Sequence, residues 1–128
     1  MQVGTQAQVA DNSGATRVRC IQVLRGRPRA RLGQEVVVAV CAVSRNAKVK
    51  RGTVHRALVV RQARLTPRRD GSAWCAPGVG GQASRPKTWV VLLTSQGQPL
   101  GTRMVGALGW ELRAAGHRKL LSLASSLL

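Results

Sequence analysis

Aromatic and acidic residues are scarce in this chain of 128 residues. It has three Trp and no Tyr or Phe, and only four residues are Asp or Glu. The lack of Tyr and Phe excludes an RNA-recognition sheet that stacks bases on those rings. The shortage of carboxylates leaves little material for acid–base catalysis or for an oxygen-ligand site that binds Ca²⁺ or Mg²⁺. We therefore expect a protein that is not an enzyme.

Cysteine is also sparse, and long apolar runs are absent. Cys20, Cys41 and Cys75 are odd in number, widely spaced and without a CxxC pair, which disfavours both a disulfide framework and a zinc site. Cys20 and Cys41 lie in apolar runs, and we expect both to be small core residues. The longest apolar run, residues 36–43, has the length of a strand and not of a membrane span. Residues 1–4 lack the features of a signal peptide. We expect no cofactor, no metal and no membrane partner.

Positive charge is abundant and unevenly distributed. The formal net charge is +17, from 21 Lys or Arg against four acids. Residues 17–69 hold 13 of the 17 Arg and two of the four Lys, with Glu35 as their only acid. A folded domain with this balance repels itself unless counterions or phosphates neutralise it, and Arg suits bidentate contact with phosphate oxygens. The composition predicts a polyanionic partner, most simply a nucleic acid.

The order of predicted elements favours a mainly β fold. Alternation and β-branched runs predict strands at 17–24, 35–43, 55–62 and 89–94, preceded by a short, mildly apolar segment at 6–10. Turn or loop signals lie at 11–14, 25–31, 45–52, 66–71 and 98–101, with a long Gly, Ala, Ser and Pro-rich loop at 71–86. Helical composition marks 108–115 and 117–125, separated by Gly116. The pattern predicts one domain over 1–128, a small β-barrel over about 1–104 with a helical appendix over about 105–128.

The basic residues cluster at predicted loops and strand ends. Loops at the ends of a barrel can converge on one surface and contact several phosphates, with a steep dependence on salt. The candidate nucleic-acid contacts are Arg17, Arg19, Arg25, Arg27, Arg29, Arg31, Lys48, Lys50, Arg51, Arg64, Arg68 and Arg69. Trp74, Trp89 and Trp110 are either stacking partners for bases or anchors in a core or interface. A rival interpretation is a free barrel-type RNA chaperone or single-strand binder, which the lack of an aromatic platform disfavours.

An ordered set of short strings resembles a known family. The strings are Val9-Ala10-Asp11-Asn12-Ser13-Gly14-Ala15, Cys20-Ile21-Gln22-Val23-Leu24, Lys48-Val49-Lys50-Arg51-Gly52, Arg69-Asp70-Gly71-Ser72, Gln98-Pro99-Leu100-Gly101-Thr102-Arg103 and Lys119-Leu120-Leu121-Ser122-Leu123-Ala124. In this order they resemble the fourteenth protein of the large ribosomal subunit, over nearly the whole chain. Each string alone is weak, and the ordered set is specific.

The resemblance implies a five-stranded β-barrel with a small helical C-terminal part. It also implies a structural role: binding large-subunit rRNA and helping to form an intersubunit bridge to small-subunit rRNA. The implied protein partners are large-subunit protein nineteen and the ribosome silencing factor, which blocks subunit joining. The residues that match the docking face for that factor are Thr102, Arg103 and Lys119.

The chain also departs from the family pattern. Residues 74–86 exceed the usual loop by several residues, and Trp89 stands near the place of an expected Phe or Tyr. The loop 25–31 lacks its usual aromatic residue, and the Pro-Glu pair expected after Ala124 is absent. Such divergence suggests an organellar ribosome, with the mitochondrion as first choice and the plastid as second.

Overall fold

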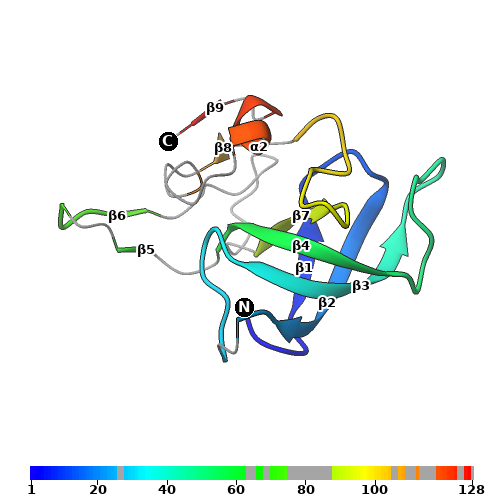
Figure 1. The fold of residues 1–128 in the computed structure, drawn as a ribbon, viewed down its shortest axis with the longest axis horizontal. Coiled ribbons are helices and arrows are strands. Elements are labelled where there is room, and N and C mark those ends of the chain that lie inside the picture. The colour runs from blue at the N-terminus through cyan, green and yellow to red at the C-terminus, as the bar shows by residue number, and fades with distance from the viewer. Residues whose placement is uncertain are drawn as a thin grey trace, which may run out of the picture.

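Five strands form a closed barrel in the computed structural model (Figure 1). The structure describes residues 1–25, 28–62, 66–67, 70–74, 88–104, 107–108, 112, 118–123 and 126–127. The barrel strands, in spatial order, are β1 (Gln6–Val9), β2 (Ala15–Val23), β3 (Glu35–Val43), β4 (Val54–Arg61) and β7 (Trp89–Leu93). The prediction of a five-stranded β-barrel is confirmed. The predicted strand bounds differ from the observed ones by at most two residues.

One parallel pair closes the barrel. All the other pairs of neighbouring barrel strands are antiparallel, whereas β1 and β7 run parallel with Gln8 opposite Trp89 and Val9 opposite Val90. The bond from the Gln8 amide to the Thr88 carbonyl, 3.0 Å long, belongs to this seam. The seam joins residues about eighty positions apart, so the C-terminal half of the chain completes a sheet that the N-terminal half begins.

Small aliphatic side chains fill the barrel. A five-stranded barrel has a narrow interior, which suits Val and Ala better than aromatic rings. The interior cluster includes Val18, Val36, Val38, Val59 and Val90, each fully buried. Strand β2 alternates between this interior and solvent, apart from two irregularities in register. One leaves Thr16 and Arg17 both exposed, and the other leaves Ile21 and Gln22 both exposed.

A second buried cluster lies outside the barrel, on β4 and β7. Leu58 and Val60 of β4 and Val91 and Leu93 of β7 pack there with Leu120 and other residues of the C-terminal part. Both strands are therefore covered on both faces, which explains why their apolar runs are continuous instead of alternating. In Figure 1 the C-terminal elements gather at one side of the barrel.

The described residues of the C-terminal part include a short helix and two short strands. Helix α2 (Arg118–Leu123) confirms the predicted helix 117–125 over its described residues. The predicted helix 108–115 is wrong at its start, because Leu108 belongs to strand β8 (Ala107–Leu108), which pairs in parallel with β9 (Ser126–Leu127). Leu112 is helical, and the remaining residues of that prediction lie outside the described ones.

Two further expectations need correction. The predicted 66–71 turn and the start of the predicted 71–86 loop also contain two short strands, since β5 (Thr66–Pro67) pairs with β6 (Ala73–Trp74). Asp70 and Gly71 between them form a turn, as predicted. Cys20 is buried as expected, but Cys41 is only half-buried, since it lies on the outer face of β3. Within the described ranges, no helix has the length and apolar character that a membrane span requires.

Candidate nucleic-acid interface

Two arginines project from the barrel wall. Arg17 and Arg19 occupy alternate positions of β2, and both are exposed while Val18 between them is fully buried. Their neighbours on β1 are glutamines, because Gln8 lies opposite Arg17 and Gln6 lies opposite Arg19. Strand alternation thus builds two parallel rows of polar side chains on the outer surface.

The β2–β3 connection carries the next basic cluster at one end of the barrel. Arg25, Arg29 and Arg31 are all exposed, and Arg25 has a positive φ of 64°. Ala30 between them is buried, and its amide donates to the Met1 carbonyl at 2.7 Å. When the side-chain amide of Gln2 is oriented with its oxygen toward Arg29, that oxygen accepts a hydrogen bond from Arg29 Nε at 2.6 Å. The buried alanine therefore fixes the loop while its arginines face solvent.

The β3–β4 hairpin carries the third described cluster. Lys48, Lys50 and Arg51 are exposed, and Val49 is 6% exposed and packs into the barrel core. The Lys48 amide donates to the Ser13 carbonyl at 2.9 Å, which ties the hairpin to the turn between β1 and β2. Here too a buried apolar residue holds a basic segment in place.

The two basic connections do not converge, contrary to the sequence-based expectation. They lie at opposite ends of β3, because one precedes that strand and the other follows it. Nine strand residues separate the ends by about 30 Å. Figure 1 shows the β3–β4 hairpin and the β2–β3 connection on opposite sides of the barrel. Arg17 and Arg19 lie along β2 between them, so the described cations form an elongated surface.

We call this surface the basic strip. It consists of the eight described residues among the predicted contacts: Arg17, Arg19, Arg25, Arg29, Arg31, Lys48, Lys50 and Arg51. The other four, Arg27, Arg64, Arg68 and Arg69, lie outside the described residues. Among described residues, no member of the strip forms an ion pair. The positive charge of the strip is therefore available to an external anion.

Two further exposed arginines were missed by sequence reasoning. Arg45 begins the β3–β4 hairpin next to Asn46, whose positive φ of 59° marks a tight turn. Arg56 lies on β4 and pairs with Glu35 at 3.4 Å. The predicted strand around Arg56 gave no sign of its exposure, because the face on which a strand residue lies depends on register.

The predicted docking residues occupy two elements. Thr102 and Arg103 are exposed in the segment after β7, and Lys119 is exposed on α2. Met104 and Leu120, their respective chain neighbours, belong to the same buried cluster outside the barrel. Arg103 and Lys119, two of the predicted docking residues, thus each precede a residue of one buried cluster.

Asn12 fixes the first two of these docking residues. Its Oδ1 accepts from the Thr102 amide at 2.7 Å and from the Arg103 amide at 3.1 Å, and its Nδ2 lies 2.9 Å from Thr102 Oγ1. A Cβ on Gly101 would lie 2.7 Å from the same Oδ1, so this approach requires glycine. The sequence marked residues 11–14 as a turn, and the structure shows that the turn also positions the segment 102–103.

Asp11 connects the same turn to the barrel. Its Oδ1 accepts from Ser13 Oγ at 2.6 Å and from the Ser13 amide at 3.2 Å, and its Oδ2 accepts from the Leu92 amide at 3.3 Å. Burial raises the pKa of the carboxyl above its usual value, and the hydrogen bonds from Ser13 and Leu92 offset part of that effect. These contacts give Asp11 a structural role.

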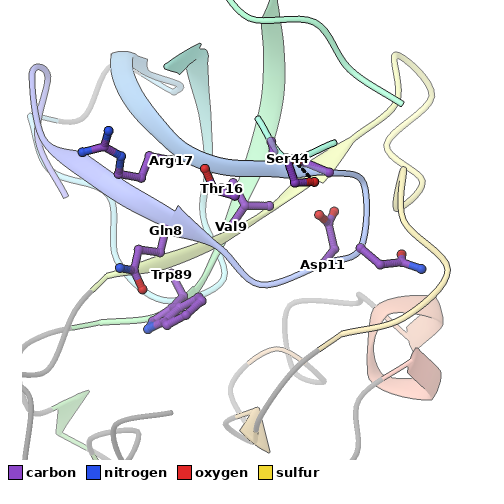
Figure 2. A pocket seen from close by; sticks show the side chains of 10 residues that line it. Gln8, Val9, Asp11, Thr16, Arg17, Ser44 and Trp89 are labelled. Atoms are coloured by element: carbon purple, nitrogen blue, oxygen red, sulfur yellow. Dashed lines mark hydrogen bonds between the residues drawn. The ribbon is translucent and has the colours of Figure 1, made fainter. Parts of the chain in front are cut away.

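A groove of about 640 Å³ opens beside this turn (Figure 2). Gln8, Arg17 and Trp89 line it together with Asp11, Thr16 and Ser44. Trp89 is half-buried, and the Arg61 guanidinium lies over its ring, 5.3 Å from the centroid. Arg61 is 1% exposed, and burial lowers the pKa of its guanidinium below the usual value.

A closed β-barrel with a basic exterior and an appended helical part defines the structural class of this protein. The profile of the family described as Ribosomal protein L14p/L23e matches residues 1–128. The chain belongs to that family, and is thus a structural, non-enzymatic protein of the large ribosomal subunit. Membership of a large-subunit family implies partners among rRNA and ribosomal proteins.

Proposed function

We propose that the basic strip binds large-subunit rRNA and that the chain helps to form a bridge to small-subunit rRNA. The observation that carries the proposal is the set of eight exposed cations that have no ion pair among the described residues. Phosphates neutralise such a surface and release condensed counterions, which supplies affinity without base-specific contacts. An elongated strip suits rRNA segments that approach the barrel from both ends.

Salt dependence and charge reversal test the rRNA contacts. Changing Arg27, Arg29 and Arg31 together to Glu should weaken incorporation into the large subunit and binding to its rRNA. The slope of log affinity against log salt should become shallower by about 0.7 to 0.9 for each phosphate that the variant no longer neutralises. Changing the same three residues to Lys is the matched control, because Lys keeps the positive charge but cannot form the paired hydrogen bonds that a guanidinium makes to phosphate oxygens. Unchanged incorporation of the Glu variant at raised salt removes this loop from the interface.

We further propose that Thr102, Arg103 and Lys119 dock the ribosome silencing factor, and that large-subunit protein nineteen is a neighbour. Support comes from the exposure of all three residues and from the burial of Met104 and Leu120 beside them in one cluster. Arg103→Glu should leave assembly intact and weaken capture of the silencing factor. Arg56→Gln is a suitable control, because it also removes an exposed arginine. Normal capture by the Arg103→Glu chain contradicts the docking role.

We propose the mitochondrial ribosome as the location, with the plastid ribosome as the alternative; the supporting observation is the divergence of this sequence from the family pattern. Sedimentation of a mitochondrial lysate at high salt tests location and role together. Persistent migration with large-subunit rRNA supports an integral ribosomal protein of that organelle. Release into light fractions favours a loosely bound RNA-binding protein, and absence from the lysate directs the search to plastids.

A further inference from the structure

One row of outer-face side chains crosses the barrel next to the groove. The register places Trp89 of β7 opposite Gln8 of β1, Gln8 opposite Arg17 of β2, and Arg17 opposite Ala42 of β3. Since partners in a sheet present their side chains on the same face, the Trp89 ring, the Gln8 amide and the Arg17 guanidinium stand side by side. Figure 2 shows Trp89, Gln8 and Arg17 along one edge of the groove.

We propose that this groove binds a single unstacked nucleotide of RNA, with its base on Trp89, its polar edge at Gln8 and its phosphate at Arg17. The proposal rests on the rRNA-binding function and names what one part of the interface recognises. The groove volume of about 640 Å³ lies within the range of about 300–1,000 Å³ that small-molecule sites occupy. One nucleotide with a short length of backbone is an occupant of that size.

The chemistry of each side chain matches one part of a nucleotide. An indole face stacks on any base, since every base has a π face. A Gln side chain both donates and accepts, so it can pair with the edge of a base, and Arg forms a fork that fits phosphate oxygens. Arg61 lies over one face of the Trp89 ring, and the ring also packs in part against the outer buried cluster. The base therefore stacks on the part of the ring that lines the groove.

The acidic residue of the groove does not oppose this assignment. The Asp11 carboxylate accepts hydrogen bonds from Ser13 and from the Leu92 amide, which hold it within the turn. Arg17 and Arg19 lie on the same strand face, and neither forms an ion pair with a described residue. The local potential therefore favours an anion, which argues for a nucleotide over an uncharged ligand.

A single aromatic ring is enough for this proposed site, although the chain has no sheet surface with several exposed aromatic rings. A sheet that binds single strands stacks several bases in succession, whereas this row offers a single indole beside an elongated basic strip. Such an arrangement suits a paired rRNA segment from which one base is extruded. Bases in bulges and loops are the ones that proteins reach in folded RNA.

A set of three RNA hairpins tests the proposal with the full chain. The first has a one-nucleotide bulge, the second has an abasic residue at the bulge, and the third is fully paired. In a chain with Trp74→Phe and Trp110→Phe, Trp89 is the only indole and reports stacking by fluorescence quenching. We expect the bulged hairpin to bind about tenfold more tightly than the abasic one, and to quench Trp89 more strongly.

Adjacent rows of the sheet supply matched control variants. Gln8→Leu and Arg17→Gln should reduce the preference for the bulged over the abasic hairpin. Gln6→Leu and Arg19→Gln change the same residue types on the same strands, one row away from Gln8 and Arg17. They should leave the preference intact, although Arg19→Gln lowers affinity for all three hairpins. Trp89→Phe, which keeps an apolar ring, should retain part of the preference.

The outcomes separate this inference from the function on which it rests. Equal affinity for the bulged and abasic hairpins, or equal quenching by both, overturns the nucleotide site and leaves phosphate-directed binding in place. Equal effects of Arg17→Gln and Arg19→Gln on the preference overturn it as well. If none of the hairpins binds in a salt-dependent manner, the proposed rRNA contact itself fails.

Discussion

Replacing Gly14 by Ala should destabilise the barrel strongly, because two separate costs meet at this position. Gly14 has a φ of +99°, which L-residues with a Cβ rarely adopt. An added Cβ would also lie 2.4 Å from the Ala47 Cα, which belongs to the backbone of the β3–β4 hairpin. The hairpin must move or the turn must open, because the atoms that the added Cβ meets are the Cα and the Cβ of Ala47, and neither belongs to the flexible end of a long side chain.

The magnitude follows from adding these costs. A left-handed conformation costs a non-glycine residue about 1–2 kcal/mol. Overpacking a tight contact costs about 1–3 kcal/mol. The expected loss for Gly14→Ala is therefore about 2–5 kcal/mol of unfolding free energy, a large share of the roughly 5–15 kcal/mol typical of a domain. At this chain length that corresponds to a fall of about 8–20 °C in Tm.

Gly52→Ala is the matched control. Gly52 has a similar φ of +84° and lies in the hairpin that Gly14 contacts, but an added Cβ there meets nothing within 4 Å. It should incur only the conformational cost of about 1–2 kcal/mol. The loss of unfolded-state entropy on changing Gly to Ala applies to both variants and cancels in the difference.

Urea unfolding of the two variants and the parent chain measures the difference directly. Gly14→Ala should be less stable than Gly52→Ala by about 1–3 kcal/mol, the share due to the contact with Ala47. The hairpin that carries Lys48 should also show faster amide exchange in Gly14→Ala, since Gly14 accepts from the Ser44 amide at 2.8 Å. Equal destabilisation of the two variants would refute the close-contact argument.

Three further variants, the last with a control, probe other parts of the structure. Asn12→Ala should cost about 1–2 kcal/mol and speed amide exchange at residues 102–103, because their hydrogen bonds to its side chain disappear; unchanged exchange contradicts the positioning role. Burial raises the Asp11 pKa, so the folded chain holds that proton to higher pH than the unfolded chain, and the contribution to stability falls as pH rises from 3.8 through the raised pKa. Asp11→Asn should flatten that part of the stability profile, and an identical profile would show that the carboxyl is not responsible. Leu120→Ala should cost about 2–5 kcal/mol, because the side chain is 2% exposed in the outer cluster; exposed Lys119→Ala should stay within about 0.5 kcal/mol, and similar destabilisation by both would show that α2 does not pack as described.

Local patterns in the sequence predicted most of the strands, because each signal lies within a few residues. The run 35–43 is β-branched and became β3 with the same bounds, and the 11–14 turn signal became the β1–β2 connection. The helix start at Leu108 was wrong, since composition there favoured a helix while pairing with β9 made a strand. Long-range pairing overrode local preference in that segment.

The candidate site was predictable in residue type and not in arrangement. The eight described members of the basic strip are exposed, as their charge in loops and alternating positions indicates. The cations of the β2–β3 and β3–β4 connections lie at opposite ends of β3 because successive strands are antiparallel. The local sequence pattern does not show which strands pair in this way. The groove was not predicted, because Gln8 and Trp89 are far apart in the chain and become neighbours only through the parallel β1–β7 seam.

The sequence by itself determined the charge, the strand segments, the tight turn at 11–14 and the resemblance of the ordered strings to a ribosomal family, because these depend on residue type and local spacing. Only the tertiary structure decided which side chains share a face. Barrel closure placed Trp89 beside Gln8 and Arg17, and the fold brought Asn12 to the segment 102–103. The physical reason is that the sequence of one strand determines only which of its side chains alternate between the two faces. Which side chains of another strand lie beside them depends on the register between the two strands, and that register is set by the tertiary fold.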